Sequence, residues 1–430
     1  MAKKGASRGI WAVLLTAALT VALGLACFGA VLALAGPRAE QASAALRRTE
    51  APDVVTLRKT PEPTPAPTAE PASTPAPEVV STPTPEPTPE PDRAITIRVV
   101  GDIMCHDRQL AGALQADGGY SMEDWFDPIR ESLGGADLTI GNLETCFAGE
   151  EEGYSGFPHF NSPDAYADAL ANAGFDVLTT ANNHTYDFRA AGIERTLRVL
   201  DERGLAHTGA YAQQSDYDEL LICDVGGVRV GVLAYTATFN SKPKRDYCVR
   251  ALSREQAERD VAAMRRAGAD FILCMVHWGE EYEEKPGSSQ RHQAEMLAQA
   301  GVDAIFGSHP HVVQTAELLT VERDGGAVTV PVAYSMGNFI SNQQNRPCDI
   351  GVIFEIGITK DGGTGETRLE RTGYVPTVVY RWREDHRDRY AVLPCGVYKE
   401  KDGHDKQRRC RKVWEWMEQE MGAGWEILEQ

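Results

Sequence analysis

Apolar positions after residue 93 form short runs that alternate with amphipathic segments. Runs of this length and pattern predict strands, here at Ala94–Val100, Ala136–Gly141, Phe175–Thr180, Val228–Tyr235, Phe271–Val276, Val302–Phe306 and Val328–Tyr334. Several of these strands are separated by segments with helical periodicity, each followed by a glycine, the residue that commonly ends a helix: Ser162–Ala173, Ala190–Arg203, Ser253–Ala267 and Ser288–Ala300. The alternation of strand and helix predicts an α/β core. Later strands at Val328–Tyr334, Ile350–Ile358 and Thr367–Tyr380 have no helix between them and predict an antiparallel addition.

The N-terminal part of the chain has a different pattern. Residues 10–36 carry no charged side chain and are dominated by Ala, Leu and Val. About 20 apolar residues span a bilayer as a helix, so we expect a transmembrane anchor, because a cleavable signal peptide has a shorter apolar core. Basic residues within residues 1–9 predict that this end is cytoplasmic. The sequence therefore predicts a single-pass protein of the cell membrane with an extracellular C-terminal domain.

Composition changes again after the apolar run. From Thr60 to Asp92 the chain is almost entirely Pro, Thr, Glu, Ala and Ser, which favours extended polyproline II and cannot bury a core. We interpret residues 37–93 as a disordered linker, whose Pro-rich part could reach roughly 90 Å from the membrane. Residues 94–380 then form the globular domain, and residues 381–430 a C-terminal helical tail. Cys105–Cys146 and Cys395–Cys410 are candidate disulfides, since an extracellular compartment permits them.

The formal charge of the chain is −19. Duplex nucleic acid is bound mainly through Lys and Arg, so we expect no nucleic-acid partner. A local exception is the basic run Lys406–Lys412 in the tail. This run is either a solvated helix face or a surface that binds an anionic polymer.

Polar side chains collect where the predicted strands end. Val302–Phe306 leads into Gly307-Ser308-His309-Pro310-His311, where the proline predicts a tight turn that carries two imidazoles. Ligands of open α/β sheets bind outside the carboxyl ends of the strands, and neutral imidazole is the commonest metal ligand. A lone His would be structural, but the other strand ends carry matching groups: Asp102, Glu144, Asn183 with His184, and His277.

This set of side chains predicts a metal site. Carboxylate together with imidazole suits a divalent cation such as Mn, Fe or Zn. The candidate ligands are too many for one tetrahedral ion: Asp102, Glu144, Asn183, His277, His309 and His311. We therefore expect two divalent metal ions about 3.5–4 Å apart, bridged by one carboxylate.

The same residues lie in short motifs that follow one another in a fixed order: Val100-Gly101-Asp102-Ile103-Met104, Gly141-Asn142-Leu143-Glu144-Thr145, Ala181-Asn182-Asn183-His184, Val276-His277-Trp278-Gly279, Gly307-Ser308-His309-Pro310-His311-Val312-Val313-Gln314 and Ser335-Met336-Gly337-Asn338-Phe339. In this order they resemble the bacterial capsule-synthesis proteins called CapA or PgsA, of the poly-γ-glutamate type. Those proteins are similar to calcineurin-like metallophosphoesterases. The resemblance covers about residues 94–380 and implies a layered α-β-β-α sandwich in a protein of the cell surface.

The resemblance also implies roles for the site residues. Asp102 and His311 would hold one metal, Asn183, His277 and His309 the other, and Glu144 would bridge them. His184 would assist the leaving group as a general acid, with a water activated by the metals as nucleophile. Asp187, three residues on, would orient the His184 imidazole.

Two positions depart from the metallophosphoesterase pattern, and other polar residues can be placed near the site. Met104 stands where that pattern has a His, and the bridging acid is Glu144 rather than Asp, which implies that one metal is weakly held. We expect Asn142, Arg108 and Asn338 to bind substrate, although Asn338 is equally compatible with a turn. The acidic run after His277, residues 280–284, is typical of a solvated face, though one of its acids could support a ligand.

The sequence is compatible with two functions. In the first, the protein is a metal-dependent hydrolase or transferase that acts on an ester, phosphate or amide bond of a surface polymer. In the second, it is a non-catalytic component that binds or helps export an anionic polymer such as poly-γ-glutamate, together with membrane-bound synthase subunits. The presence of His184 favours chemistry, because a tether does not need it.

Overall fold

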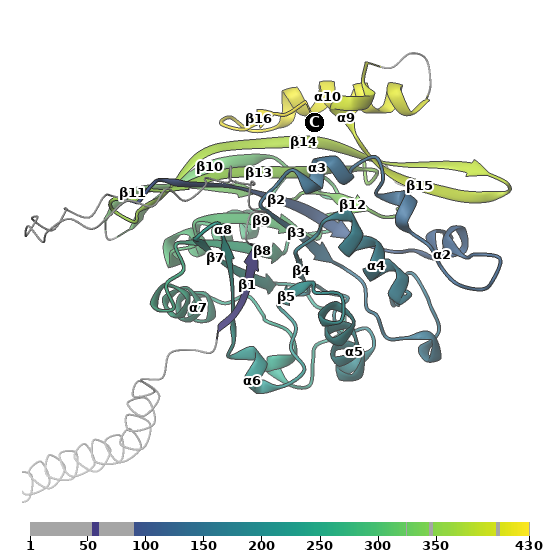
Figure 1. The fold of residues 1–430 in the computed structure, drawn as a ribbon, viewed down its shortest axis with the longest axis horizontal. Helices are drawn as coiled ribbons and strands as arrows, with labels where there is room; N and C mark the ends of the chain where they lie inside the picture. The colour runs from purple at the N-terminus through teal and green to yellow at the C-terminus, as the bar shows by residue number, and fades with distance from the viewer. Residues whose placement is uncertain (1–53, 60–89, 324, 344–346, 401–404, 430) are drawn as a thin grey trace, which may run out of the picture. The chain divides into compact units, whose positions relative to one another are not determined.

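The computed structural model describes residues 54–59, 90–323, 325–343, 347–400 and 405–429 (Figure 1). The expected cytoplasmic segment, the anchor at residues 10–36 and most of the linker at residues 37–93 lie outside these ranges. Within them, no helix is both long and apolar enough to cross a membrane.

The core consists of two mixed β-sheets. The first has the strand order β1 (Val54–Lys59), β6 (Leu220–Val225), β7 (Val228–Thr236), β8 (Phe271–His277), β9 (Ala304–Ser308), β11 (Gly326–Ala333) and β10 (Ala316–Arg323). The second has the order β15 (Arg387–Pro394), β14 (Thr367–Glu384), β13 (Ile350–Lys360), β2 (Arg93–Ile103), β3 (Leu138–Leu143), β4 (Val177–Thr179) and β5 (Ala206–Thr208). Two short strands join the second sheet, where β12 (Asn338–Ile340) pairs with β2 and β16 (Glu426–Ile427) pairs with β14.

Buried apolar side chains form three clusters that define the layers. Along β8, Leu273 and Met275 lie in the cluster between the two sheets, whereas Ile272 and Cys274 face the helices that cover the first sheet. This period of two is the alternation expected for a strand buried on both faces. The helices over the first sheet are α7 (Arg254–Arg266) and α8 (Ser288–Ala300). The third cluster joins the outer face of the second sheet to α2 (Asp107–Ala113), α3 (Arg130–Gly134), α4 (Asp164–Ala173) and α5 (Arg189–Asp201).

The predicted α/β core is confirmed, and so is most of its order. Strands β2 to β5 run parallel to one another, as do β7 to β9, so their carboxyl ends lie at common sheet edges. The antiparallel addition is confirmed for β13 and β14, which extend the second sheet from β2. β11 lies in the first sheet instead, where it pairs antiparallel with β10 and parallel with β9, so the prediction is only partly right for this strand.

The prediction of a disordered linker over residues 37–93 is wrong for one segment. Val54–Lys59 forms β1, which pairs in parallel with β6 at the edge of the first sheet. The segment Val-Val-Thr-Leu is rich in β-branched residues, which favour strands. Because β6 would otherwise be the edge of this sheet, β1 also covers its exposed backbone groups.

The prediction of a helical tail over residues 381–430 is also partly wrong. β14 continues to Glu384 and turns at Asp385 and His386, which both have positive φ, into β15. This is the backbone of a tight two-residue hairpin turn. Only then do α9 (Cys395–Tyr398) and α10 (Asp405–Glu420) follow, and α10 lies beside β14 (Figure 1). The four cysteines of the candidate disulfides, Cys105, Cys146, Cys395 and Cys410, are buried thiols, so neither bridge is formed.

Candidate metal centre

The candidate ligands converge at the carboxyl ends of strands from both sheets. Asp102 lies near the end of β2, Glu144 directly follows β3, and His277 is the last residue of β8. His309 and His311 follow β9, while Asn183 follows β4. All six side chains are buried.

These residues form two overlapping groups whose ligand atoms lie within 4.8 Å of one another. The first group is Asp102, Glu144 and His311, in which His311 Nδ1 lies 2.9 Å from Asp102 Oδ2 and Nε2 lies 3.8 Å from Glu144 Oε1. The second group is Glu144, His277 and His309, in which His277 Nε2 lies 3.6 Å from Glu144 Oε1. Asn183 adjoins this group, with its Oδ1 2.9 Å from His277 Nε2. Glu144 is thus the carboxylate that both groups share.

Glu144 has an unusual environment for a carboxylate. Both of its oxygens are buried, and neither has a hydrogen-bond partner among the described residues. Burial, together with the nearby charge of Asp102, raises the pKa of Glu144 well above its ordinary value. A buried polar group without a partner costs about 1–3 kcal/mol, and more when charged. A divalent cation would satisfy both oxygens, so this donor set fits a metal site.

The imidazoles of His277 and His309 are in the protonation state that metal binding requires. Burial lowers the pKa of His277 well below its ordinary value, and burial with the charge of His311 lowers the pKa of His309 to about 4. Both rings are therefore neutral at physiological pH, the state in which imidazole binds a metal. His309 Nδ1 is buried and has no partner among the described residues. Burial alone would raise the pKa of Asp102, but the hydrogen bond and charge of His311 lower it, so this carboxyl remains ionised.

The turn that aims His309 and His311 is strained. His309 has φ 98° and His311 has φ 58°, both in the left-handed region that costs a non-glycine residue about 1–3 kcal/mol. Gly307, just before them, allows a close approach of two backbones, since a Cβ there would lie 2.1 Å from Tyr334 O. The predicted tight turn is therefore present. It is fixed by β9 before it and by the close contact of Gly307 with the backbone of Tyr334.

The predicted acid and its partner are also in contact. His184 Nδ1 lies 2.8 Å from Asp187 Oδ2, and both side chains are buried. The same carboxylate oxygen accepts a hydrogen bond from the Phe160 backbone N–H at 2.9 Å. The Phe160 ring packs edge-on against the His184 ring with centroids 4.7 Å apart. These contacts fix the orientation of the imidazole.

Asn240 is a site residue that the sequence prediction missed. Its Oδ1 accepts a hydrogen bond from Asn183 Nδ2 at 3.2 Å, and its Nδ2 lies 3.3 Å from His184 Nε2. It therefore contacts both a candidate metal ligand and the candidate acid. Asn240 follows β7, so the strand-end rule that found the other residues could also have found it.

The residues predicted to bind substrate differ in where the structure places them. Asn142 is buried and donates to Asp102 Oδ1 at 2.8 Å, while Asn338 Oδ1 lies 3.1 Å from His311 Nδ1. Both amides therefore contact candidate metal ligands. Arg108 is 64% exposed and lies 3.8 Å from Asp388, so the structure does not bring it to the centre.

The two departures from the expected pattern can be placed as well. Met104 is buried, so the Asp102 group has no additional imidazole from that position. Glu281, from the acidic run after His277, forms a third possible ligand group with His309 and His311. Glu281 is exposed, and it is the acid of that run that lies nearest the centre.

The centre lies within a part of the chain that matches a known family. Residues 96–343 match the family model described as bacterial capsule synthesis protein PGA_cap. A similar relative is the capsule biosynthesis protein CapA of Bacillus anthracis, 28% identical over 267 residues, which are 58% of this chain and 60% of that protein. Another is the PGA biosynthesis protein CapA of Bacillus subtilis (strain 168), 27% identical over 257 residues, which are 59% of this chain and 64% of that protein. The chain thus matches less than two thirds of the length of either relative.

The similar solved structures are more distant. The NAD nucleotidase NadN of Haemophilus influenzae has a TM-score of 0.42 and 13% identity, covering 79% of this chain and 58% of that chain. A phosphatase of Mycoplasma pneumoniae has a TM-score of 0.40 and 13% identity, covering 66% of this chain and 94% of that chain. Scores of this size say nothing about the chemistry of the site.

Proposed function

Because the chain belongs to the bacterial capsule synthesis protein family, we propose that it is a divalent-metal-dependent hydrolase or transferase that acts on a surface polymer. The polymer of this proposal is anionic and resembles poly-γ-glutamate, since one relative is named for PGA biosynthesis. The proposal places the protein in the cell membrane through residues 10–36, with the globular domain outside. Its partners there would be the membrane-bound subunits of a polymer synthase.

The observation that carries this proposal is the shared carboxylate. Glu144 belongs to both ligand groups, and its buried oxygens have no other partner among the described residues. Asp102 and His311 would hold one divalent ion, and Asn183, His277 and His309 a second, with Glu144 between them. Two ions bridged in this way, in a metallophosphoesterase-like layered sandwich, suit hydrolysis or group transfer.

The protein's own side chains complete the chemistry. Divalent ions in this centre would polarise the scissile group and supply a nucleophile at neutral pH. His184 would give a proton from Nε2 to the leaving group, because its Nδ1 is held by Asp187. The Asp187 carboxylate would stabilise the charged form of the ring before that transfer. Asn240, beside His184 Nε2, would contact the same region of the substrate.

A non-catalytic role in polymer binding or export is the second candidate. It is favoured by Met104, which is buried where a further imidazole would complete the first metal's ligands. A weakly held first ion would leave a binding site without efficient turnover. The contact between His184 and Asp187 argues against this candidate, since binding alone requires no His–Asp pair.

One experiment separates the two candidates. The full chain in detergent, supplied with Mn²⁺, Zn²⁺ or Mg²⁺, is assayed against phosphoesters and poly-γ-glutamate, next to His184→Ala. We expect metal-dependent turnover that falls at least about 100-fold in the variant, the usual size of a general acid contribution, with unchanged metal content.

The matched control is His207→Ala, which removes a His–Asp pair outside the centre, where His207 Nε2 lies 3.1 Å from Asp201. It should retain full turnover. If no substrate is turned over with any of the three metals, and cells that carry His184→Ala make polymer normally, the enzyme proposal fails and the binding role stands.

A further inference from the structure

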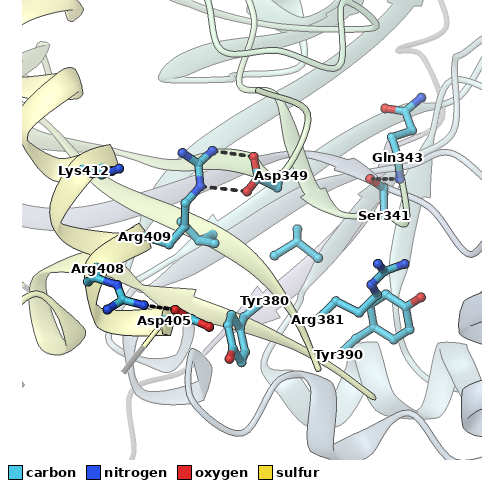
Figure 2. A pocket seen from close by; sticks show the side chains of 12 residues that line it. Ser341, Gln343, Asp349, Tyr380, Arg381, Tyr390, Asp405, Arg408, Arg409 and Lys412 are labelled. Carbon is cyan, nitrogen blue, oxygen red and sulfur yellow. Dashed lines mark hydrogen bonds and ion pairs between the residues drawn. The ribbon is translucent and has the colours of Figure 1, made fainter. Parts of the chain in front are cut away.

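A cavity lies outside the metal centre, between α10 and the β14–β15 hairpin (Figure 2). Its volume is about 520 Å³, within the range of sites that hold small ligands or polymer segments. Most of it is built after residue 343, beyond the part of the chain that matches the family model. It is lined by Ser341, Gln343, Asp349, Val378, Val379, Tyr380, Arg381, Tyr390, Asp405, Arg408, Arg409 and Lys412.

The charge of this cavity contrasts with that of the whole chain. Four of its side chains are cations, Arg381, Arg408, Arg409 and Lys412, and two are carboxylates. The chain as a whole carries −19. A local excess of positive charge in an acidic protein attracts an anion to that place, because the rest of the surface repels anions.

The cations on α10 form one stripe of the helix. Asp405, Arg408, Arg409 and Lys412 are spaced i, i+3, i+4 and i+7, while Cys410, Val413 and Met417 on another face are buried. Like charges four residues apart, as in Arg408 and Lys412, destabilise a helix by a few tenths of a kcal/mol. Arg409 of this stripe links α10 to Asp349, whereas the repulsion between Arg408 and Lys412 brings the fold no gain and is typical of charges kept for a ligand.

The cations are also positioned on both walls of the cavity. Asp349 holds Arg409 through two contacts of 2.8 and 2.5 Å, and Arg408 pairs with Asp405. Arg381 and Lys412 are both exposed, and neither has a carboxylate partner among the described residues. Both cations are therefore available to a ligand. Figure 2 shows Arg408, Arg409 and Lys412 on the helix and Arg381 across from them on the strand.

The cavity adjoins the metal centre through the segment Ser341–Gln343. Gln343 Oε1 accepts a hydrogen bond at 2.8 Å from Asn338, the amide that contacts His311. Asn342, in the same segment, donates its backbone N–H to His106 Nδ1 at 3.2 Å, and its Oδ1 accepts a hydrogen bond at 2.7 Å from Tyr390 of the cavity lining. This segment therefore connects the lining of the cavity to an amide that contacts a candidate ligand.

We propose that this cavity binds a stretch of a carboxylate-bearing polymer chain and so presents the neighbouring stretch to the metal centre. This inference rests on the proposed function for its polymer class. The four cations of the lining outnumber its two carboxylates, so the cavity favours an anionic chain, and the polymer class of the proposed function makes its anionic group a carboxylate. Arg409 already holds the Asp349 carboxylate bidentately, the geometry in which guanidinium binds such groups. The hydroxyl of Tyr380 adds a neutral donor.

The test is a binding measurement on the metal-free full chain in detergent and EDTA, so it does not depend on any catalysis. Fluorescently labelled poly-γ-glutamate is titrated and followed by anisotropy, with polyphosphate and dextran as the other probes. We expect poly-γ-glutamate to bind and its Kd to rise at least tenfold in Arg381→Ala/Arg408→Ala/Lys412→Ala. Binding should weaken with added salt, which screens exposed charges.

The matched control removes three exposed cations from α5 and α7, as Arg198→Ala/Arg254→Ala/Arg259→Ala. Its Kd should change less than threefold, and both triple variants should unfold near the wild-type temperature. The milder Lys412→Gln, at one exposed position, should weaken binding about threefold and tests the proposal even if a triple variant does not fold. The proposal is overturned if the first triple variant binds like wild type, if both triples lose affinity equally, or if only polyphosphate binding depends on these cations.

Discussion

Glu144 is the residue on which the candidate centre depends most, because it belongs to both ligand groups. Its environment is favourable for a metal and unfavourable for the metal-free protein, since its buried oxygens have no partner among the described residues. Binding residues often impose such a cost on the fold that holds them. The cost can be measured separately from any activity.

The first prediction concerns Glu144→Gln in the metal-free full chain. Burial raises the pKa of Glu144 above its ordinary value of 4.5, so the folded state keeps this proton to higher pH than the unfolded state. The stability of the metal-free protein therefore falls as pH rises above about 4.5. Gln cannot ionise, so we expect the variant to be more stable in EDTA by roughly 1–3 kcal/mol at pH 8, with a smaller gain at pH 5.

Thermal unfolding with and without Mn²⁺ or Zn²⁺ measures this prediction. Wild type should gain stability when metal is added, and Glu144→Gln should gain less, because it loses at least one of the ions. Glu258→Gln, an exposed acid on α7, is the control and should change stability by less than about 0.5 kcal/mol. A destabilised Glu144→Gln in EDTA, or one that gains as much stability from metal as wild type, would show that the carboxylate has a structural role only.

At the scale of elements, the centre is made by strand ends that approach each other very closely. A β-bulge at Gly101 interrupts the pairing of β2 with β3 just before Asp102. The Asp102 N–H donates to Gly337 O at 3.0 Å, which joins β2 to the turn before β12. Glycine is required here, because a Cβ on Gly101 would lie 2.0 Å from that oxygen. This contact places both Asp102 and Asn338.

We therefore predict that Gly101→Ala separates β2 from β12 and disturbs the ligands with them. The variant should lose roughly 3 kcal/mol of stability, the upper range for an overpacked site, and bind metal at least tenfold more weakly. Gly134→Ala is the control, since no atom lies within 4 Å of its Cβ position in α3. That variant should be as stable as wild type or up to about 1 kcal/mol more stable. Equal effects of the two substitutions would contradict the account.

The sequence predicted strands that form a continuous apolar run, but not the short strands that depend on pairing with their neighbours. Long apolar strands such as β8 and β9 were predicted within two residues, because their burial on both faces leaves a continuous apolar run. β5 and β12 have only three residues each and exist through pairing with their neighbours, which no local pattern encodes. β1 was missed because its six residues lie in a segment whose composition favours disorder.

The same limit applies to the site. A strand-end rule brought the candidate ligands together because parallel strands share an edge, a property of the whole sheet. It could not tell which side of a strand end a residue faces. Asn142 and Asn338 were predicted to bind substrate, and the structure adds their contacts with the candidate ligands Asp102 and His311, which the rule did not predict. Arg108 was predicted near the centre from its sequence position, yet α2 directs it toward Asp388.

At the scale of the molecule, the C-terminal region is part of the folded unit that holds the centre. α10 packs Cys410, Val413, Trp414 and Met417 into the cluster between the sheets, against β14. The boundary at residue 380 drawn from the sequence therefore divides β14. The cavity beside the centre exists only because this region folds back onto the hairpin.

This arrangement predicts a large effect of Trp414→Ala on global stability. Trp414 is 6% exposed, and truncating a buried Trp costs roughly 3–5 kcal/mol. Trp416→Ala on the same helix is the control, because this side chain is only partly buried and should cost about 1 kcal/mol. Urea unfolding of the full chain compares them. Equal and small losses would mean that the tail is independent of the core.

The central claim is that strand ends from two sheets together hold a pair of divalent ions through Glu144. Elemental analysis of the full chain, purified without chelator, tests it most directly when Glu144→Gln is measured beside it. The account predicts two bound divalent ions per wild-type chain and loss of at least one of them in the variant. Wild-type protein without stoichiometric divalent metal, or a variant with the same metal content as wild type, would contradict it.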